Sequence, residues 1–160
     1  HIIHFDFLIY CGVDLWIFFQ LWHIWKKIIA ALHSGWKGAY KKIVNNTINN
    51  LKKKGCNVND LIVVIGPSIS KHRYEVKNDF LKKFIDQNKK NKIFFNYSKK
   101  KIFFSLNEYI KNQFKDIGVK NIEIINKDTY LRKNNFFSHR RALKNKYNDY
   151  GRNISVIMIK

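Results

Sequence analysis

The 160-residue sequence has one proline, seven glycines, two cysteines and only 11 acidic residues. So few prolines and glycines exclude the collagen-like and proline-rich linker classes. Two cysteines, Cys11 and Cys56, are too few for a disulfide framework, so we expect a reducing, cytoplasmic environment. The first residues also lack the charged, apolar and small-residue segments of a secretory signal.

Hydrophobic residues make up 46% of the chain and aromatic residues 16%. A chain this apolar is not globally disordered, and its length suits one compact domain better than two. The sequence begins with His1 rather than methionine, which leads us to expect a fragment or a trimmed product.

Positive charge dominates, with 31 lysines and arginines and a formal net charge of +20. Clustered cations favour nucleic-acid binding because they release counterions from phosphates. Arginine, however, is the residue favoured for forked contacts with phosphates and bases, and only five are present: Arg73, Arg132, Arg140, Arg141 and Arg152. Asparagine, isoleucine and phenylalanine are abundant too, which is typical of an A+T-rich genome. We therefore expect no specific nucleic-acid partner, and keep a non-catalytic basic module that binds a polyanion as an alternative.

Residues 7–25 form an unusually apolar stretch. A membrane-spanning helix needs about 20 predominantly apolar residues, and Asp14, Gln20 and His23 interrupt this one. The stretch therefore predicts buried strands, and no membrane association is expected.

Further along the chain, apolar runs and helical spacing alternate. Strands are predicted at 28–32, 61–65, 122–125 and 154–159, helices after residue 36 and at 74–84 and 106–117, a polar turn at 33–38 and an exposed connection at 89–101. Gly55 and Gly118 stand where left-handed helix terminators are expected, and Ser105 with Glu108 has the form of a capping box. Alternating strands and helices favour an α/β or α+β domain.

Two local patterns suggest chemistry without deciding it. His33 follows a predicted strand, where a histidine can be a metal ligand, a general base or a hydrogen-bonded turn residue. Arg140 and Arg141 stand beside Phe136 and Phe137, an arrangement that suits either an anion site or a solvated basic turn.

The combination of motifs is far more specific than either pattern. Four segments occur in a fixed order: 28–38 (IIAALHSGWKG), 65–76 (IGPSISKHRYEV), 128–141 (DTYLRKNNFFSHRR) and 150–159 (YGRNISVIMI). This series resembles the laccase-domain family, also called multicopper polyphenol oxidoreductase or peptidoglycan editing factor, whose members resemble purine nucleoside phosphorylases. The resemblance implies an α+β fold, a single domain of residues 1–160 with α–β–β–α layers and mixed sheets. Compared with this family we expect the N-terminal segment to be lacking and residues 1–27 to be atypical.

The activity implied by the resemblance is phosphorolysis of adenosine, inosine and methylthioadenosine, with deamination of adenosine. The partners would then be a purine nucleoside and phosphate. The family also implies a zinc site of two histidines and one cysteine, in which His33 is one ligand. Cys11 is the only nearby thiol, but it precedes His33 by 22 residues, more than in the family, so it is either a ligand or a small buried residue.

The remaining roles follow from the same resemblance. Arg140 and Arg141 are candidates for positioning phosphate, and Gly35, Trp36, Lys37 and Gly38 form a candidate substrate-binding loop. The family's first histidine has no counterpart in this sequence, and a catalytic zinc normally needs three protein ligands. We therefore expect weak, substoichiometric zinc binding and poor turnover, with a copper polyphenol oxidase as the alternative enzyme.

Overall fold

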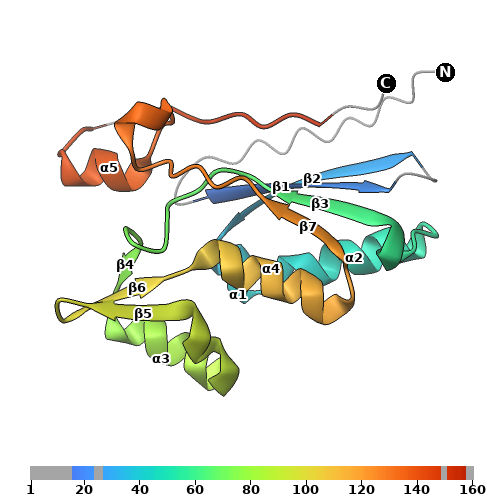
Figure 1. Cartoon of the computed structure of the whole chain (residues 1–160), viewed down its shortest axis with the longest axis horizontal. Coiled ribbons are helices and arrows are strands. Elements are labelled where there is room, and N and C mark those ends of the chain that lie inside the picture. The colour runs from blue at the N-terminus through green and yellow to red at the C-terminus, as the bar shows by residue number, and fades with distance from the viewer. Residues whose placement is uncertain (1–15, 24–26, 149–150, 158–160) are drawn as a thin grey trace.

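The computed structural model describes residues 16–23, 27–148 and 151–157. It is a single α+β domain with a mixed four-stranded sheet, a small antiparallel sheet and helices packed between them (Figure 1), so the expected fold class is confirmed. The large sheet has the order β2-β1-β3-β7 and the small one the order β4-β6-β5. The strands are β1 (Trp16–His23), β2 (Ile28–Gly35), β3 (Leu61–Ile65), β4 (Glu75–Val76), β5 (Phe95–Ser98), β6 (Lys101–Phe104) and β7 (Asn121–Ile124). The helices are α1 (Trp36–Tyr40), α2 (Ile43–Lys53), α3 (Asn78–Gln87), α4 (Leu106–Ile117) and α5 (His139–Lys144).

The large sheet buries one face against helices. Leu61, Val63 and Ile65 alternate along β3 with more exposed residues and are at most 1% exposed, which is the period-two pattern of a strand with one covered face. Helices α1, α2 and α4 lie along that face (Figure 1). The predicted strands at 28–32, 61–65 and 122–125 are all present, and the apolar stretch before residue 25 contributes β1.

Helix α2 buries a stripe of residues, Val44, Ile48 and Leu51, at the predicted spacing. Gly55 and Gly118 have the positive φ values, 79° and 99°, that were expected after the helices. The prediction of one helix after residue 36 was incomplete, because Lys42 adopts a left-handed conformation (φ 57°) and separates α1 from α2. Ser105 is the N-cap of α4, but its side chain makes no cap hydrogen bond, so the capping box was wrong in that respect.

The small sheet corrects two predictions. The helix expected at 74–84 begins only at Asn78, and Glu75–Val76 pairs with β6 instead. The connection expected at 89–101 contains a 3₁₀ helix (Lys89–Phe94) and strand β5, with Phe94 and Phe95 buried. In both places long-range ring packing overrides local propensity: the Tyr74 ring lies 5.9 Å from that of Phe104.

A C-terminal segment, 151–157, passes over the other face of the large sheet, where Gln20 Nε2 donates to Val156 O at 2.7 Å (Figure 1). Asn153 exchanges two hydrogen bonds of 2.9 Å with the backbone of Phe137. The strand predicted at 154–159 is not formed at 154–157, and residues 158 and 159 lie outside the described residues. Among the described residues, no helix has both the length and the apolar character needed to cross a membrane.

Candidate active site

Three strands of the large sheet end at the same edge. Because β1 is antiparallel to both β2 and β3, and β3 is parallel to β7, the strands β2, β3 and β7 run in one direction. We call the edge at which they end, at Gly35, Ile65 and Ile124, the carboxyl edge. Ligands of open sheets commonly bind beyond the carboxyl ends of parallel strands, so the segments that leave this edge are the first place to look for a site.

His33 lies on β2, two residues before the carboxyl edge, rather than in the predicted turn. Its neighbours Leu32 and Ser34 are buried on the helix-covered face, so alternation places His33 on the opposite face. Both of its ring nitrogens are shielded from solvent, and burial lowers the pKa of the imidazole from 6.5 to about 4. At neutral pH His33 is therefore uncharged, the form that ligates metals and accepts hydrogen bonds.

The turn predicted at 33–38, with its candidate loop Gly35–Gly38, is not formed, because β2 runs to Gly35 and α1 begins directly at Trp36. Gly35 is the N-cap of α1, and Trp36 packs edge-on against Phe80 with ring centroids 5.0 Å apart. A Cβ at Gly38 would lie 3.0 Å from Ser34 Oγ, so glycine here lets α1 sit close to the end of β2. The side chain of Lys37 is exposed.

The segments that follow β3 and β7 are joined to each other. Ser68 and Asp128 form a parallel bridge, in which Thr129 N donates to Ser68 O at 3.0 Å. The Ser68 hydroxyl donates to Asn107 Oδ1 at 2.6 Å, which ties both segments to the first turn of α4. Two of the three segments that leave the carboxyl edge are thus joined to each other and to α4.

Asp128 holds an arginine at this edge. Arg73 Nε lies 3.6 Å from Asp128 Oδ2, and its guanidinium lies 5.2 Å from the ring centroid of Tyr130. Tyr130 N donates to the other carboxylate oxygen of Asp128 at 2.8 Å. The Asp128 side chain is 11% exposed and that of Arg73 is 46% exposed. The result is an oriented cation whose side chain is half-exposed. Both residues lie within the motifs of the family resemblance, but neither was assigned a role there; the scarcity of arginine was a signal that could have singled out Arg73.

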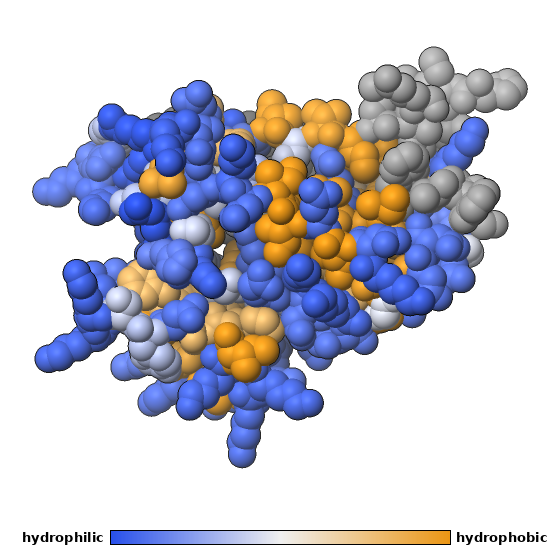
Figure 2. Space-filling view, in the orientation of Figure 1, coloured by the Kyte–Doolittle hydropathy of each residue, from blue (hydrophilic) through white to orange (hydrophobic). Residues whose placement is uncertain are grey.

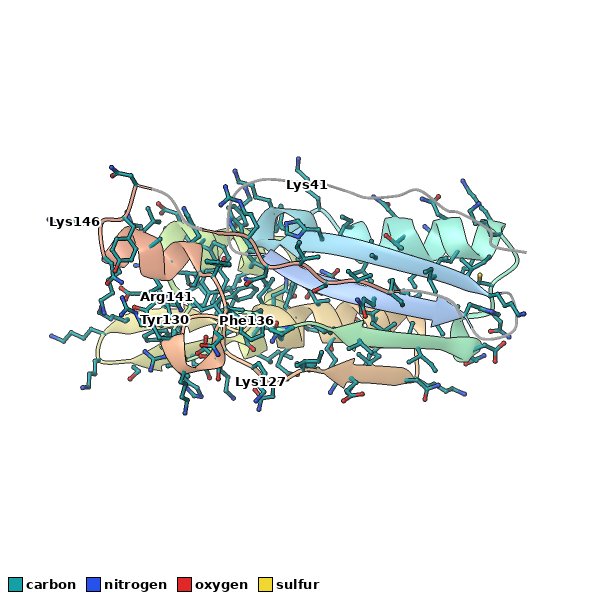
Figure 3. All side chains as sticks on the ribbon, turned by 90° about the horizontal axis from the view of Figure 1, so that it is seen from above. Lys41, Lys127, Tyr130, Phe136, Arg141 and Lys146 are labelled. Atoms are coloured by element: carbon teal, nitrogen blue, oxygen red, sulfur yellow. The ribbon has the colours of Figure 1, made fainter. Side chains whose placement is uncertain are left out.

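The paired arginines of α5 have different surroundings. Arg141 donates to three backbone carbonyls, those of Thr129, Tyr130 and Phe136, at 2.6–3.1 Å (Figure 3). Its guanidinium therefore holds the segment after β7 in place. Arg140 donates to Glu75 O at 3.2 Å and lies 5.5 Å from the ring centroid of Tyr74. These contacts link α5 to the small sheet.

Metal ligands are not assembled within the part of the chain that the structure describes. No group of three histidine, cysteine, aspartate or glutamate side chains suited to a metal occurs among residues 16–23, 27–148 and 151–157. His33 is a single suitable donor, and Cys11 lies outside the described residues. Cys56 is buried in the hydrophobic core. The described residues therefore do not fit a zinc site on their own.

Comparison with known proteins places these features in a family. The family model described as multi-copper polyphenol oxidoreductase laccase matches residues 19–160, nearly the whole chain. The chain belongs to this laccase family. The match covers His33, the Ser68–Asp128 bridge and both arginines of α5, so every part of the carboxyl edge lies inside the family's domain.

Relatives of this laccase-family chain carry a different activity in their names. This chain is 40% identical over 106 residues to a purine nucleoside phosphorylase of Rickettsia conorii, and 37% identical over 106 residues to one of Rickettsia prowazekii. Each alignment covers 65% of this chain and 43% of the relative. The chain thus spans less than half the length of these relatives.

Solved structures share the fold. A hypothetical protein of Bacillus licheniformis, YfiH, superimposes with a TM-score of 0.73 at 24% identity, covering 81% of this chain and 50% of that one. YlmD of Geobacillus stearothermophilus gives a TM-score of 0.72 at 20% identity, with the same coverage. At these identities the likeness establishes the fold alone.

Proposed function

We propose that the carboxyl edge is part of a site for phosphorolysis of purine nucleosides. The observation that carries the proposal is the Arg73–Asp128–Tyr130 cluster, an oriented and half-exposed cation at the strand ends where His33 also lies. The names of the Rickettsia relatives support the reaction class. Because the chain spans less than half of those relatives, the activity of a whole protein is part of the proposal.

The chemistry sets what the residues must do. A phosphate oxygen attacks C1′ of the ribose, and the bond from C1′ to the purine nitrogen breaks with its electron pair remaining on the purine. The purine takes up a proton, and the products are ribose 1-phosphate and the free base. Fixed cations are needed to hold the phosphate in line with C1′ and to stabilise charge as it moves.

The proposed roles follow from the contacts. Arg73, fixed by Asp128, binds phosphate, and Arg140 is a second candidate for that role. Arg141 acts as a positioning residue because its donors hold backbone carbonyls. His33, neutral at pH 7, is in the form that ligates a metal. The backbone of Gly35–Gly38 borders the substrate.

Adenosine, inosine and methylthioadenosine are the proposed nucleosides. Deamination of adenosine would additionally require an activated water to replace the amino group of the purine. The family implies zinc for that task, and the described residues do not fit a zinc site alone. Ammonia release from adenosine, measured separately from ribose 1-phosphate, tests for deamination.

Zinc binding itself is testable on the purified chain. We expect less than one zinc per chain by metal analysis, and a weak affinity, because one histidine cannot hold the metal. His33→Ala should then remove the little that binds. One tightly held zinc per chain would contradict this expectation and would show that residues outside the described ones complete the site.

Two alternatives remain. Copper oxidase activity is supported by the family description, but oxygen reduction by four electrons needs several copper centres, and the described residues assemble no three-ligand group. A visible absorption band after copper loading, with oxidation of a phenol, would favour it. The basic binding module is supported by the net charge of +20.

The decisive assay measures ribose 1-phosphate from inosine and saturating phosphate. Arg73→Gln should lower kcat/KM about 100-fold, with a raised KM for phosphate, because one oriented cation is lost. Arg132→Gln removes an exposed arginine that donates to Tyr147 Oη and serves as the matched control. Equal rates for the two variants, or no product with metal present, would overturn the proposal.

A further inference from the structure

One face of the small sheet carries a row of side chains that the candidate active site does not use. Val76 pairs with Ile102, and Ile102 pairs with Tyr97, so the three lie side by side on one face. Ile102 is buried, at 9% exposure, whereas Tyr97 at the outer strand is 61% exposed. The row therefore ends in an aromatic ring that is open to solvent.

A shallow cavity of about 390 Å³ lies beside Val76 and Ile102, and Tyr97 is not part of its lining. It is lined by Glu75, Val76, Lys77, Asn78, Asp79, Lys100, Lys101 and Ile102. The Glu75 carboxylate is already paired with Lys101, at 2.8 Å. No acidic side chain among the described residues lies within ion-pair distance of Lys77 or Lys100. Three of the lining side chains are lysines and two are carboxylates, so positive charge exceeds negative charge by one.

The adjoining β5–β6 turn adds more positive charge in an unfavourable conformation. Ser98 pairs with Lys101, so Lys99 and Lys100 form a two-residue turn, with φ values of 47° and 62°. Such turns favour Asn-Gly, because residues other than glycine, asparagine and aspartate rarely adopt positive φ. Two exposed lysines are therefore held here against local backbone preference.

The surrounding sequence is basic and has no negative charge. Residues 89–101 contain six lysines and no acidic residue. The hairpin projects from one end of the molecule (Figure 1), and hydrophilic side chains extend from that end in the space-filling view (Figure 2). The hairpin is therefore accessible to a large, extended ligand.

We propose that this hairpin surface, defined as Val76, Lys77, Tyr97, Lys99, Lys100 and Ile102, binds single-stranded nucleic acid without sequence preference. An exposed aromatic ring beside lysines is the arrangement that stacks an unpaired base and contacts its phosphates. A duplex hides its base faces and would gain only the charge contacts. The proposal does not depend on phosphorolysis.

The first test measures binding of a fluorescein-labelled 12-nucleotide oligothymidine by anisotropy, at about 0.15 M salt. The double variant Lys99→Asn/Lys100→Gly installs the residues that the turn prefers, so it folds while losing two charges. We expect its affinity to fall about 10-fold. The control, Lys52→Gln/Lys53→Gln, removes the same charge from the exposed end of α2 and should change affinity less than about 2-fold.

The second test separates stacking from charge. Tyr97→Ser should weaken binding of the single strand about 10-fold and leave binding of a 12-base-pair duplex unchanged, while Tyr97→Phe should retain the affinity for the single strand. Equal losses for the two lysine pairs, or no effect of Tyr97→Ser, would mean that only overall charge acts and would overturn the proposal. Binding to vesicles of anionic lipid with the same dependence on Tyr97, in place of the oligonucleotide, would overturn it as well.

Discussion

The two sheets of this molecule are stabilised by different kinds of core. The large sheet packs aliphatic side chains such as Val63 and Ile65 against the aliphatic stripe of α2. The small sheet packs aromatic rings. The ring of Phe84, for example, has the rings of Phe80, Phe104 and Tyr109 as neighbours, with centroids 4.7–5.1 Å apart. Aliphatic packing follows from periodicity along one strand or helix. Ring packing gathers single residues from distant segments, so it leaves little periodic signal.

Removing a ring from the small sheet should have the largest effect. Phe84 is 0% exposed, and Phe84→Ala should lower the free energy of unfolding by about 4 kcal/mol, through lost burial and a cavity that neighbours cannot fill. Urea denaturation measures it. The control Ile93→Ala, at a residue 73% exposed, should change stability by less than about 0.5 kcal/mol. Similar values for the two would show that the ring cluster is not a core.

The carboxyl edge of the large sheet depends on polar contacts instead, and Arg141 is the residue to test. Arg141→Gln removes hydrogen bonds from a charged donor to three carbonyls, and we expect a loss of about 2 kcal/mol in unfolding free energy. Arg132→Gln, on the exposed side of the same segment, should cost far less. A loss confined to ligand binding, with unchanged stability, would favour a direct catalytic role for Arg141.

Substitutions in the β5–β6 turn of the small sheet should raise the stability of the protein. Lys99→Asn/Lys100→Gly places residues that tolerate positive φ at both turn positions, and should raise unfolding stability by about 1 kcal/mol. Thermal unfolding measures the gain. A destabilised variant would mean that the two lysines make favourable contacts that outweigh their backbone strain.

A pH-dependent effect is expected at His33 on the large sheet. Its folded-state pKa of about 4 lies below the usual 6.5, so below pH 6.5 the unfolded chain binds the proton first. Stability should therefore fall as pH decreases from about 6.5 to about 4. His33→Asn should remove that part of the pH dependence in denaturation curves of metal-free protein. An unchanged curve would mean that the imidazole protonates freely in the folded state.

These regions also differ in how far the sequence predicts them. Strand β3, the stripe of α2 and the glycines after α2 and α4 were all predictable, since apolar spacing and left-handed glycines act within a few residues of chain. The motif order similarly indicated the family, although it did not indicate Arg73. The position beside Phe136 and Phe137 drew attention to Arg140 and Arg141, yet the guanidinium of Arg141 is occupied by backbone carbonyls.

What the sequence by itself determined, then, is the set of local elements in the large-sheet half and membership of the family. Tertiary structure alone decided that residues 75–76 pair as a strand, that the rings of Phe84 and Phe104 meet, and that Asp128 orients Arg73 from a distant part of the chain. The physical reason is how far apart along the chain the interacting residues are. Periodicity and turn preferences operate between near neighbours, whereas ring packing, salt bridges and donors to distant carbonyls exist only after the chain has folded and brought those groups together.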